Sequence, residues 1–100
     1  MSRMKIVRIF IRGRVQGVGF RYFVAGEAEV SRLEGWVRNR RDGSVEVVLA
    51  GDEARVDGMI EALRRGPPVS RVEKIDVVAA SGADLMHRHA GEKFSVLPTA

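Results

Sequence analysis

The sequence contains no cysteine among its 100 residues. Without thiols the chain can form no disulfide, thiolate nucleophile, cysteine-ligated zinc site or iron–sulfur cluster. Histidine is also scarce, because the two present, His87 and His89, form a single His-x-His pair with no third ligand nearby. Two imidazoles alone are weak evidence for a metal site, and we interpret the pair as part of an exposed loop.

Long apolar runs are absent as well. No stretch of the chain approaches the roughly 18 consecutive apolar residues that a membrane-spanning helix needs. Residues 1–11 alternate charged and hydrophobic side chains, so they lack the continuous apolar core of a secretory signal peptide. We therefore predict a cytoplasmic protein that does not bind membranes.

The length and composition favour one folded unit. A chain of 100 residues has enough apolar area for one hydrophobic core, but two cores would leave each half short. Hydrophobic residues make up 45% of the sequence and charged residues 30%, which is too apolar for a disordered, charged tail. No internal repeat or low-complexity tract divides the chain. We predict a single domain over residues 1–100.

Positive charge is concentrated in the first two fifths of the chain. Residues 1–41 contain ten Lys or Arg and three Asp or Glu, whereas residues 42–100 contain seven and ten. Fourteen of the seventeen cations are arginine, whose planar guanidinium suits bidentate contacts with phosphate or carboxylate groups. We therefore expect the N-terminal part of the domain to attract anions.

Hydrophobic periodicity predicts a strand followed by a helix in the first third of the chain. Apolar and other residues alternate with period two over residues 7–12, which predicts a strand ending at Gly13. From Phe20 the apolar and small positions follow three-four spacing, which predicts a helix to about Leu33. Gly26 is a weak point in this helix because glycine costs roughly 1 kcal/mol relative to alanine.

A hairpin is predicted next. Residues 35–39 and 45–49 are two apolar runs separated by a short polar segment that contains Asp42 and Gly43. An Asp-Gly pair between apolar runs is typical of a β-hairpin, because the turn needs a positive φ angle. We expect two adjacent antiparallel strands.

The second half of the chain repeats the helix–strand order. Asp52 is placed to cap a helix that ends at Gly66, directly before two prolines. Residues 72–79 are predicted to form a strand, and residues 80–92 a loop because they are polar, small and aperiodic. The short alternation at residues 94–96 predicts a last edge strand.

This order, β-α-β-β-α-β with room for one further short strand, is typical of the ferredoxin-like split βαβ arrangement. We predict an α+β sandwich in which a largely antiparallel sheet of four to five strands carries two helices on one face. The fold alone does not settle function, because enzymes, metal carriers, RNA-binding modules and regulatory domains all use it.

The glycine-rich segment 13–21, with the sequence GRVQGVGFR, connects the first predicted strand to the first helix. Glycines allow successive backbone N–H groups to face one concavity, and the first helical turn adds unpaired N–H groups with a partial positive charge. Arg21 stands at the start of the helix, where a cation opposes the macrodipole unless a bound dianion lies between them. We interpret the segment as an anion cradle; a tight turn beside a surface arginine is the alternative.

Asn39 is the second candidate, near the end of a predicted strand and just before the Asp-Gly turn. A carboxamide accepts a hydrogen bond from water through its oxygen and donates one to a phosphoryl oxygen through its nitrogen. It can therefore position a nucleophilic water without acting as a base. The alternative is a turn-flanking asparagine that bonds only to its own hairpin.

Taken together, these residues resemble the acylphosphatase family. The motifs that carry the resemblance are residues 13–21, 35–39, 42–46 and 66–68, and Phe94. The resemblance extends from about Lys5 to Val96, which is nearly the whole chain. Two residues depart from the family pattern, since Gly26 lies within the first helix and Arg32 stands where relatives usually have the glycine that ends it.

The resemblance implies a hydrolase of acyl phosphates that releases a carboxylate and inorganic phosphate and needs neither metal nor cofactor. It implies that Arg21 and Asn39 are catalytic, with Arg21 holding the phosphoryl group and Asn39 orienting the attacking water. Ser44 is the supporting residue, placed to fix the orientation of the Asn39 amide. The backbone N–H groups that share the phosphate are those of Arg14, Val15, Gln16, Gly17, Val18, Gly19 and Phe20.

A carboxylic–phosphoric anhydride already has a good leaving group, so positioning and charge stabilisation are the main requirements. We expect in-line attack of the Asn39-bound water on phosphorus, with the transition-state charge held by Arg21 and the loop amides. The expected partners are a small-molecule acyl phosphate and inorganic phosphate, with no nucleic acid and no membrane, and we expect a monomer.

Two other functions remain open from the sequence. A nucleic-acid-binding module suits the fold and the basic N-terminal part, but residues 45–49 offer no aromatic side chain for base stacking and only Phe10 lies on the first strand. The third possibility is a non-catalytic domain that senses phosphate or acyl phosphate. Such a domain would bind the same anion without turning it over.

Overall fold

The computed structural model describes residues 3–100. Their helices and strands are, in chain order, β1 (Met4–Arg14), α1 (Phe20–Val30), β2 (Glu34–Asn39), β3 (Val45–Asp52), α2 (Glu53–Arg65), β4 (Arg71–Ala79), the 3₁₀ helix η1 (Gly82–His87) and β5 (Phe94–Val96). None of the helices in this part of the chain is long and apolar enough to cross a membrane.

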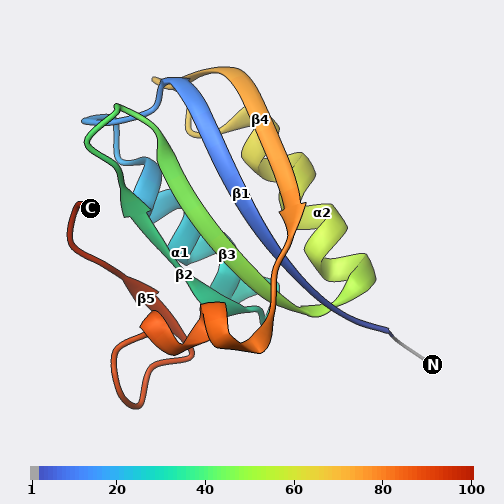
Figure 1. Cartoon of the computed structure of the whole chain (residues 1–100). Helices are drawn as coiled ribbons and strands as arrows, with labels where there is room; N and C mark the ends of the chain where they lie inside the picture. Colours follow the sequence, from blue (N-terminus) through green and yellow to red (C-terminus); the bar gives the residue numbers. More distant parts are fainter. Residues whose placement is uncertain (1–2) are drawn as a thin grey trace.

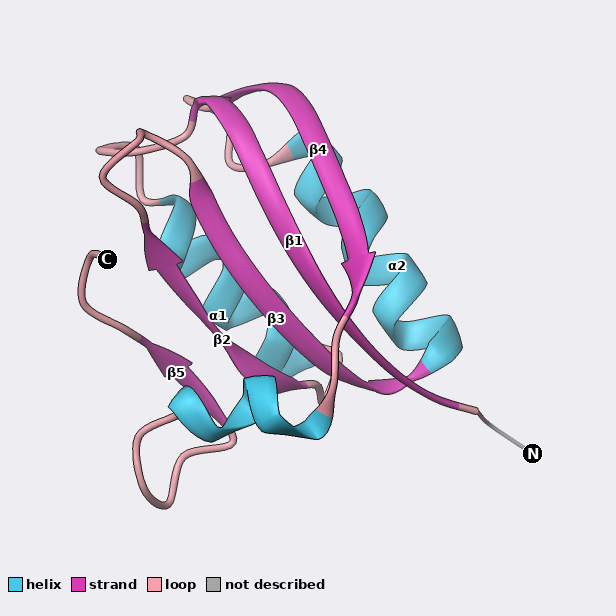
Figure 2. Ribbon diagram, in the orientation of Figure 1, coloured by secondary structure: helices cyan, strands magenta, loops and turns pink. Residues whose placement is uncertain are grey.

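The strands form one sheet in the order β4-β1-β3-β2-β5. Three of the four pairings are antiparallel, and the short β5 pairs parallel to β2. Helices α1 and α2 cover one face of the sheet, and η1 lies on the opposite face (Figure 1, Figure 2). The prediction of a ferredoxin-like α+β sandwich with a largely antiparallel sheet is therefore confirmed.

The main core lies between the sheet and the two helices. It is built by strand positions of one parity, because successive side chains of a strand point to opposite faces, and by one face of each helix. Its buried members include Val7, Ile9, Ile11, Val24, Ala28, Val37, Val45, Val47, Leu49, Val56, Met59 and Leu63. Burial of apolar surface contributes about 25 cal/mol per Å², so this layer is the main source of stability for the loops that it carries.

A smaller core lies on the other face and explains one wrong prediction. Residues 80–92 were predicted as loop, but they contain η1, whose start is fixed by a capping box between Ser81 and Asp84. Leu85 of η1 packs against the buried cluster of Trp36, Val48 and Leu97, and the Trp36 indole N–H donates to the carbonyl of Asp84 at 2.6 Å. Hydrophobic periodicity misses such a segment because a 3₁₀ helix of six residues is too short to show a repeat.

Helix α1 ends at Val30, about three residues earlier than predicted. The backbone N–H of Leu33 donates to Ala28 O at 2.9 Å and that of Arg32 to Glu29 O at 3.2 Å. These two bonds form a Schellman motif, whose residue at the Arg32 position is left-handed and is commonly glycine. Arg32 has φ 55°, and it is the one non-glycine residue with positive φ in the described part of the chain.

The other predicted boundaries are confirmed within one to three residues. The carboxylate of Asp52 accepts the backbone N–H of Arg55 at 3.3 Å and so caps α2, whose C-cap residue is Gly66 with φ 64°. In the β2–β3 hairpin Gly43 has φ 93°, as the turn requires. This hairpin brings the end of β2 to the same end of the sheet as the loop between β1 and α1 (Figure 1).

Candidate active site

The loop between β1 and α1 spans residues 15–19 and approaches the helix through two left-handed glycines. Gly17 has φ 72° and Gly19 has φ 78°, whereas Val18 between them does not have a positive φ. Alternation of left-handed and right-handed backbone directs neighbouring N–H groups toward one point and creates an anion-binding concavity. A side chain with a Cβ atom would be strained at both glycines, so the sequence favours this conformation.

The start of α1 adds positive potential to this loop. Gly19 is the N-cap residue, so no side chain accepts the free N–H groups of the first turn. The first turn also contains no acidic residue. An uncapped helix N-terminus attracts anions through its free N–H groups and its partial charge of about half a unit. Arg21 lies in this same turn and adds a full positive charge.

A cavity of about 90 Å³ lies between the loop, the first turn of α1 and the end of β2. It is lined by Val15, Gly17, Gly19, Phe20, Arg21, Tyr22 and Asn39. Because a water molecule occupies about 30 Å³ in the liquid, the cavity has room for an anion of a few heavy atoms, such as a phosphoryl group. The larger part of any organic substrate would lie outside it.

Asn39 is the last residue of β2 and lines the same cavity as Arg21. Its backbone carbonyl accepts the N–H of Ala100 at 3.0 Å, which fixes the end of the strand. Its side-chain Oδ1 is buried and has no hydrogen-bond partner among the described residues. A buried, unpaired acceptor costs about 1–3 kcal/mol, and a bound water or ligand that donates to it would remove this cost.

The Ser44 hydroxyl makes no hydrogen bond to the Oδ1 atom of Asn39 in the described part of the chain. Its hydroxyl donates to Asp42 Oδ1 at 2.6 Å, and its backbone N–H donates to the same oxygen at 2.9 Å. Both bonds lower the pKa of Asp42 below its ordinary value, and the bond from the hydroxyl has the larger effect. The positive charge of Arg12 lowers this pKa further. Ser44 can therefore affect the position of Asn39 only indirectly, by stabilising the hairpin turn. Its supporting role stays a prediction.

Six of the ten predicted site residues line the cavity: Val15, Gly17, Gly19, Phe20, Arg21 and Asn39. The other four, Arg14, Gln16, Val18 and Ser44, lie around it without lining it. Tyr22 lines the cavity and was missed by sequence reasoning. The signal that could have found it is its position in the first helical turn, directly after Arg21.

The histidine pair lies away from this cavity. The His87 ring packs edge-on against Trp36 with ring centroids 5.7 Å apart, and His89 Nδ1 lies 3.0 Å from Glu92 Oε1. Within residues 3–100, no three His, Asp or Glu side chains gather closely enough to hold a metal ion. The expectation of a metal-free reaction stays a prediction.

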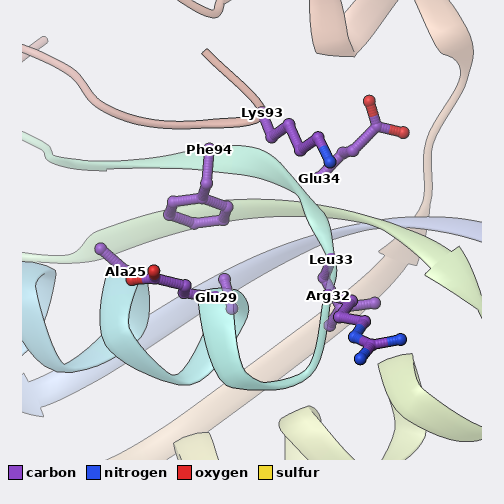
Figure 3. A pocket seen from close by; sticks show the side chains of 8 residues that line it. Ala25, Glu29, Arg32, Leu33, Glu34, Lys93 and Phe94 are labelled. Carbon is purple, nitrogen blue, oxygen red and sulfur yellow. The ribbon is translucent and has the colours of Figure 1, made fainter.

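A larger hollow of about 800 Å³ lies between the C-terminal end of α1 and β5 (Figure 3). It is lined by Ala25, Ala28, Glu29, Arg32, Leu33, Glu34, Lys93 and Phe94. None of these belongs to the predicted site, and the rim carries two acidic and two basic side chains. The C-terminal end of a helix carries partial negative charge, so an anion is favoured in the smaller cavity at the other end of α1.

Comparison with known proteins decides the family. The family model described as Acylphosphatase matches residues 7–95. The chain belongs to the acylphosphatase family. The match covers the glycine-rich loop of residues 15–19, Arg21 and Asn39, so the family predicted from the sequence motifs is confirmed.

Individual relatives agree over nearly the full length. An acylphosphatase of Bradyrhizobium diazoefficiens is 56% identical over 99% of both chains. An acylphosphatase of Rhodopseudomonas palustris is 52% identical over 94% of this chain and 95% of its own. The crystal structure of the Bacillus subtilis acylphosphatase has a TM-score of 0.80 at 41% identity, covering 95% of this chain and 99% of that one. These likenesses confirm the expected acylphosphatase activity and the fold.

Proposed function

We propose that this acylphosphatase cleaves the carboxyl–phosphate bond in the 90 Å³ cavity, with Arg21 and Asn39 as its catalytic residues. The observation that carries the proposal is that these two side chains, from different elements, line one small cavity at an uncapped helix N-terminus. The positive groups come from the loop and the helix, and the unpaired amide comes from the end of β2. This arrangement suits a phosphoryl group facing a water molecule.

The phosphoryl group binds to the backbone N–H groups of residues 15–20 and to the Arg21 guanidinium. Hydrogen bonds to a charged group contribute about 1.5–3 kcal/mol each, which is more than neutral ones. In-line displacement at phosphorus places charge on the equatorial oxygens in the transition state. Donors fixed by the fold around these oxygens need no reorganisation when that charge develops.

The Asn39 side chain orients the nucleophile. Its unpaired Oδ1 accepts one hydrogen bond from water, and its NH₂ group donates to a phosphoryl oxygen. The water oxygen forms a bond to phosphorus while the bond from phosphorus to the carboxyl oxygen breaks. The products are a carboxylate and inorganic phosphate.

The proton of the attacking water needs an acceptor other than a carboxylate or imidazole, because neither group lines the cavity. A water that attacks phosphorus lies next to the phosphoryl oxygens. We therefore propose that one of these oxygens takes the proton from the water. The leaving carboxylate is a weak base and needs no general acid. On this account the reaction uses no metal ion, and we propose that the enzyme acts as a monomer on small-molecule acyl phosphates.

A nucleic-acid-binding function is less well supported. Trp36, which could stack on a base from the open sheet face, is fully buried beneath η1 and the arginine side chains. Phe10 on β1 lies under the Arg40 guanidinium at 5.9 Å. Base stacking needs an exposed aromatic face, and these contacts occupy the aromatic side chains of this sheet face.

Hydrolysis of benzoyl phosphate by the purified protein in EDTA tests the proposal. We expect release of equal amounts of benzoate and phosphate, competitive inhibition by inorganic phosphate, and loss of turnover in a folded Arg21→Ala variant. Turnover that disappears in EDTA and returns with a divalent cation would overturn the metal-free mechanism. Binding of phosphate without turnover would favour the phosphate-sensing function instead.

A further inference from the structure

The side chain of Gln16 connects the anion-binding loop to the β2–β3 hairpin. Its Nε2 atom donates to the backbone carbonyl of Arg40 at 2.7 Å and to that of Ser44 at 2.8 Å. Both hydrogens of the amide nitrogen are therefore used, and the group is partly buried. The family resemblance gives Gln16 only a backbone role in holding phosphate, and these side-chain bonds are additional to it.

The two carbonyls that accept from Gln16 also close the hairpin turn. Arg40 O accepts the backbone N–H of Gly43 at 3.1 Å, and Ser44 O accepts the backbone N–H of Arg40 at 2.8 Å. Since a carbonyl oxygen has two lone pairs, each can accept both bonds. Only a closed turn presents the two carbonyls together, so the Gln16 amide fits this conformation of the hairpin.

This connection joins two halves of the site that are otherwise held by different elements. The groups that face phosphate belong to residues 15–21, whereas Asn39 belongs to the end of β2. In the described part of the chain, the two bonds from Gln16 are the hydrogen bonds that join residues 15–19 to residues 39–44. The acceptor Arg40 directly follows Asn39, so the connection acts next to the residue that orients water.

We propose that Gln16 is a positioning residue that sets the distance between the Asn39-bound water and the bound phosphoryl group. The inference rests on the proposed roles of Arg21 and Asn39. Displacement of a reacting group by about 1 Å can cost about 100-fold in rate. The two hydrogen bonds from Gln16 are therefore expected to raise kcat by holding the two halves of the site at a fixed distance. Loss of these two hydrogen bonds is expected to disturb the placement of water while leaving the binding of phosphate nearly unchanged.

The Gln16→Met variant tests this role, because methionine has a similar length and no N–H donor. We expect kcat for benzoyl phosphate to fall about 10- to 100-fold, while the inhibition constant of inorganic phosphate changes less than about twofold. Arg40 O and Ser44 O keep their bonds within the turn, so neither is left unpaired. A lysine side chain again carries several donors, and Gln16→Lys is expected to recover kcat to within about threefold of wild type.

The matched control is Ser95→Ala, far from the cavity. The Ser95 hydroxyl also makes two hydrogen bonds, accepting from His89 N at 2.9 Å and donating to Glu92 at 2.7 Å. Its loss is expected to lower stability without changing kcat of the folded enzyme. If Gln16 only stabilises the fold, Gln16→Met will behave in the same way, and the proposal is then wrong.

A double-mutant cycle with Asn39→Ala completes the test. If Gln16 acts through Asn39, Gln16→Met lowers kcat by less than about threefold once Asn39 is alanine, because the two effects are not additive. An equal loss in both backgrounds, or a raised phosphate inhibition constant at unchanged kcat, would overturn the proposal. If Gln16→Met does not fold, a folded Gln16→Lys with kcat as low as that of Asn39→Ala would overturn it. Failure of the proposed roles of Arg21 and Asn39 is distinct, since folded Arg21→Ala or Asn39→Ala would then keep near-wild-type kcat whatever Gln16→Met does.

Discussion

Arg21 and Asn39 line the same cavity of about 90 Å³, although one lies in the first turn of α1 and the other ends β2. The fold makes this possible because the β1–α1 loop and the β2–β3 hairpin lie at the same end of the sheet (Figure 1). The positive groups come from the loop and helix, and the amide comes from the strand. We propose that the loop and helix make most of the phosphate contacts and that the strand residue Asn39 places the water.

Removal of the Arg21 guanidinium is expected to reduce kcat/KM by at least about 100-fold, as loss of a donor that stabilises transition-state charge commonly does. Arg21→Lys is expected to recover little, because one ammonium group cannot make the bidentate contacts of a guanidinium. Steady-state kinetics with benzoyl phosphate measure both values, and circular dichroism checks the fold. Near-wild-type turnover by folded Arg21→Ala would remove Arg21 from the mechanism.

Asn39→Ala is expected to lower kcat while leaving inhibition by inorganic phosphate largely unchanged. The reason is that most of the proposed phosphate contacts lie on the loop and on α1, so loss of the single Asn39 N–H contact weakens phosphate binding less than it disturbs the placement of water. The two quantities are measured in one set of inhibition experiments. An unchanged kcat with a weaker affinity for phosphate would instead make Asn39 a binding residue.

The position of much of this candidate site could be predicted from the sequence, because its glycines, Arg21 and Asn39 belong to local sequence patterns and line one cavity. The loop at residues 13–21 and the Asp-Gly hairpin follow from residues close together in the chain. The partner of the Ser44 hydroxyl and the contacts of the Gln16 amide depend on where distant elements meet, and no local pattern shows them. The 3₁₀ helix η1 was missed for a related reason, since its Leu85 packs against a cluster that includes the distant Trp36.

Arg32→Gly is expected to stabilise the protein by about 0.5–1 kcal/mol. Arg32 has φ 55° in the Schellman motif after α1, and a left-handed conformation costs a non-glycine residue about 1–3 kcal/mol. The greater freedom of glycine in the unfolded chain offsets part of this gain. Urea unfolding measures the change.

The neighbouring Ser31 provides the control for this substitution. It has φ −84°, so it carries no such strain. Ser31→Gly is therefore expected to destabilise by about 0.5–1 kcal/mol. If both variants lower the free energy of unfolding equally, the conformation of Arg32 is not strained.

The hairpin turn is expected to weaken in acid through Asp42. Hydrogen bonds from the Ser44 hydroxyl and backbone N–H lower the pKa of Asp42 below the ordinary 3.8. A lowered pKa means that the stabilisation is complete above about pH 3.8 and is lost as the pH falls through the pKa of the folded protein. Asp42→Asn keeps an acceptor for both bonds but does not titrate.

Unfolding free energies of wild type and Asp42→Asn, measured between pH 7 and pH 2, test this expectation. The difference in unfolding free energy between the two proteins is expected to stay constant near neutral pH. In the acid range wild type is expected to lose stability relative to Asp42→Asn. A difference that does not depend on pH would show that the carboxylate charge contributes nothing to the turn.

The position of bond cleavage tests the central claim most directly, namely that a water held by Asn39 attacks phosphorus. Wild-type enzyme is allowed to hydrolyse benzoyl phosphate in ¹⁸O-labelled water, and both products are analysed by mass spectrometry. Attack on phosphorus places one ¹⁸O atom in inorganic phosphate and none in benzoate. A label found in benzoate would mean attack on the carbonyl carbon and would contradict the account.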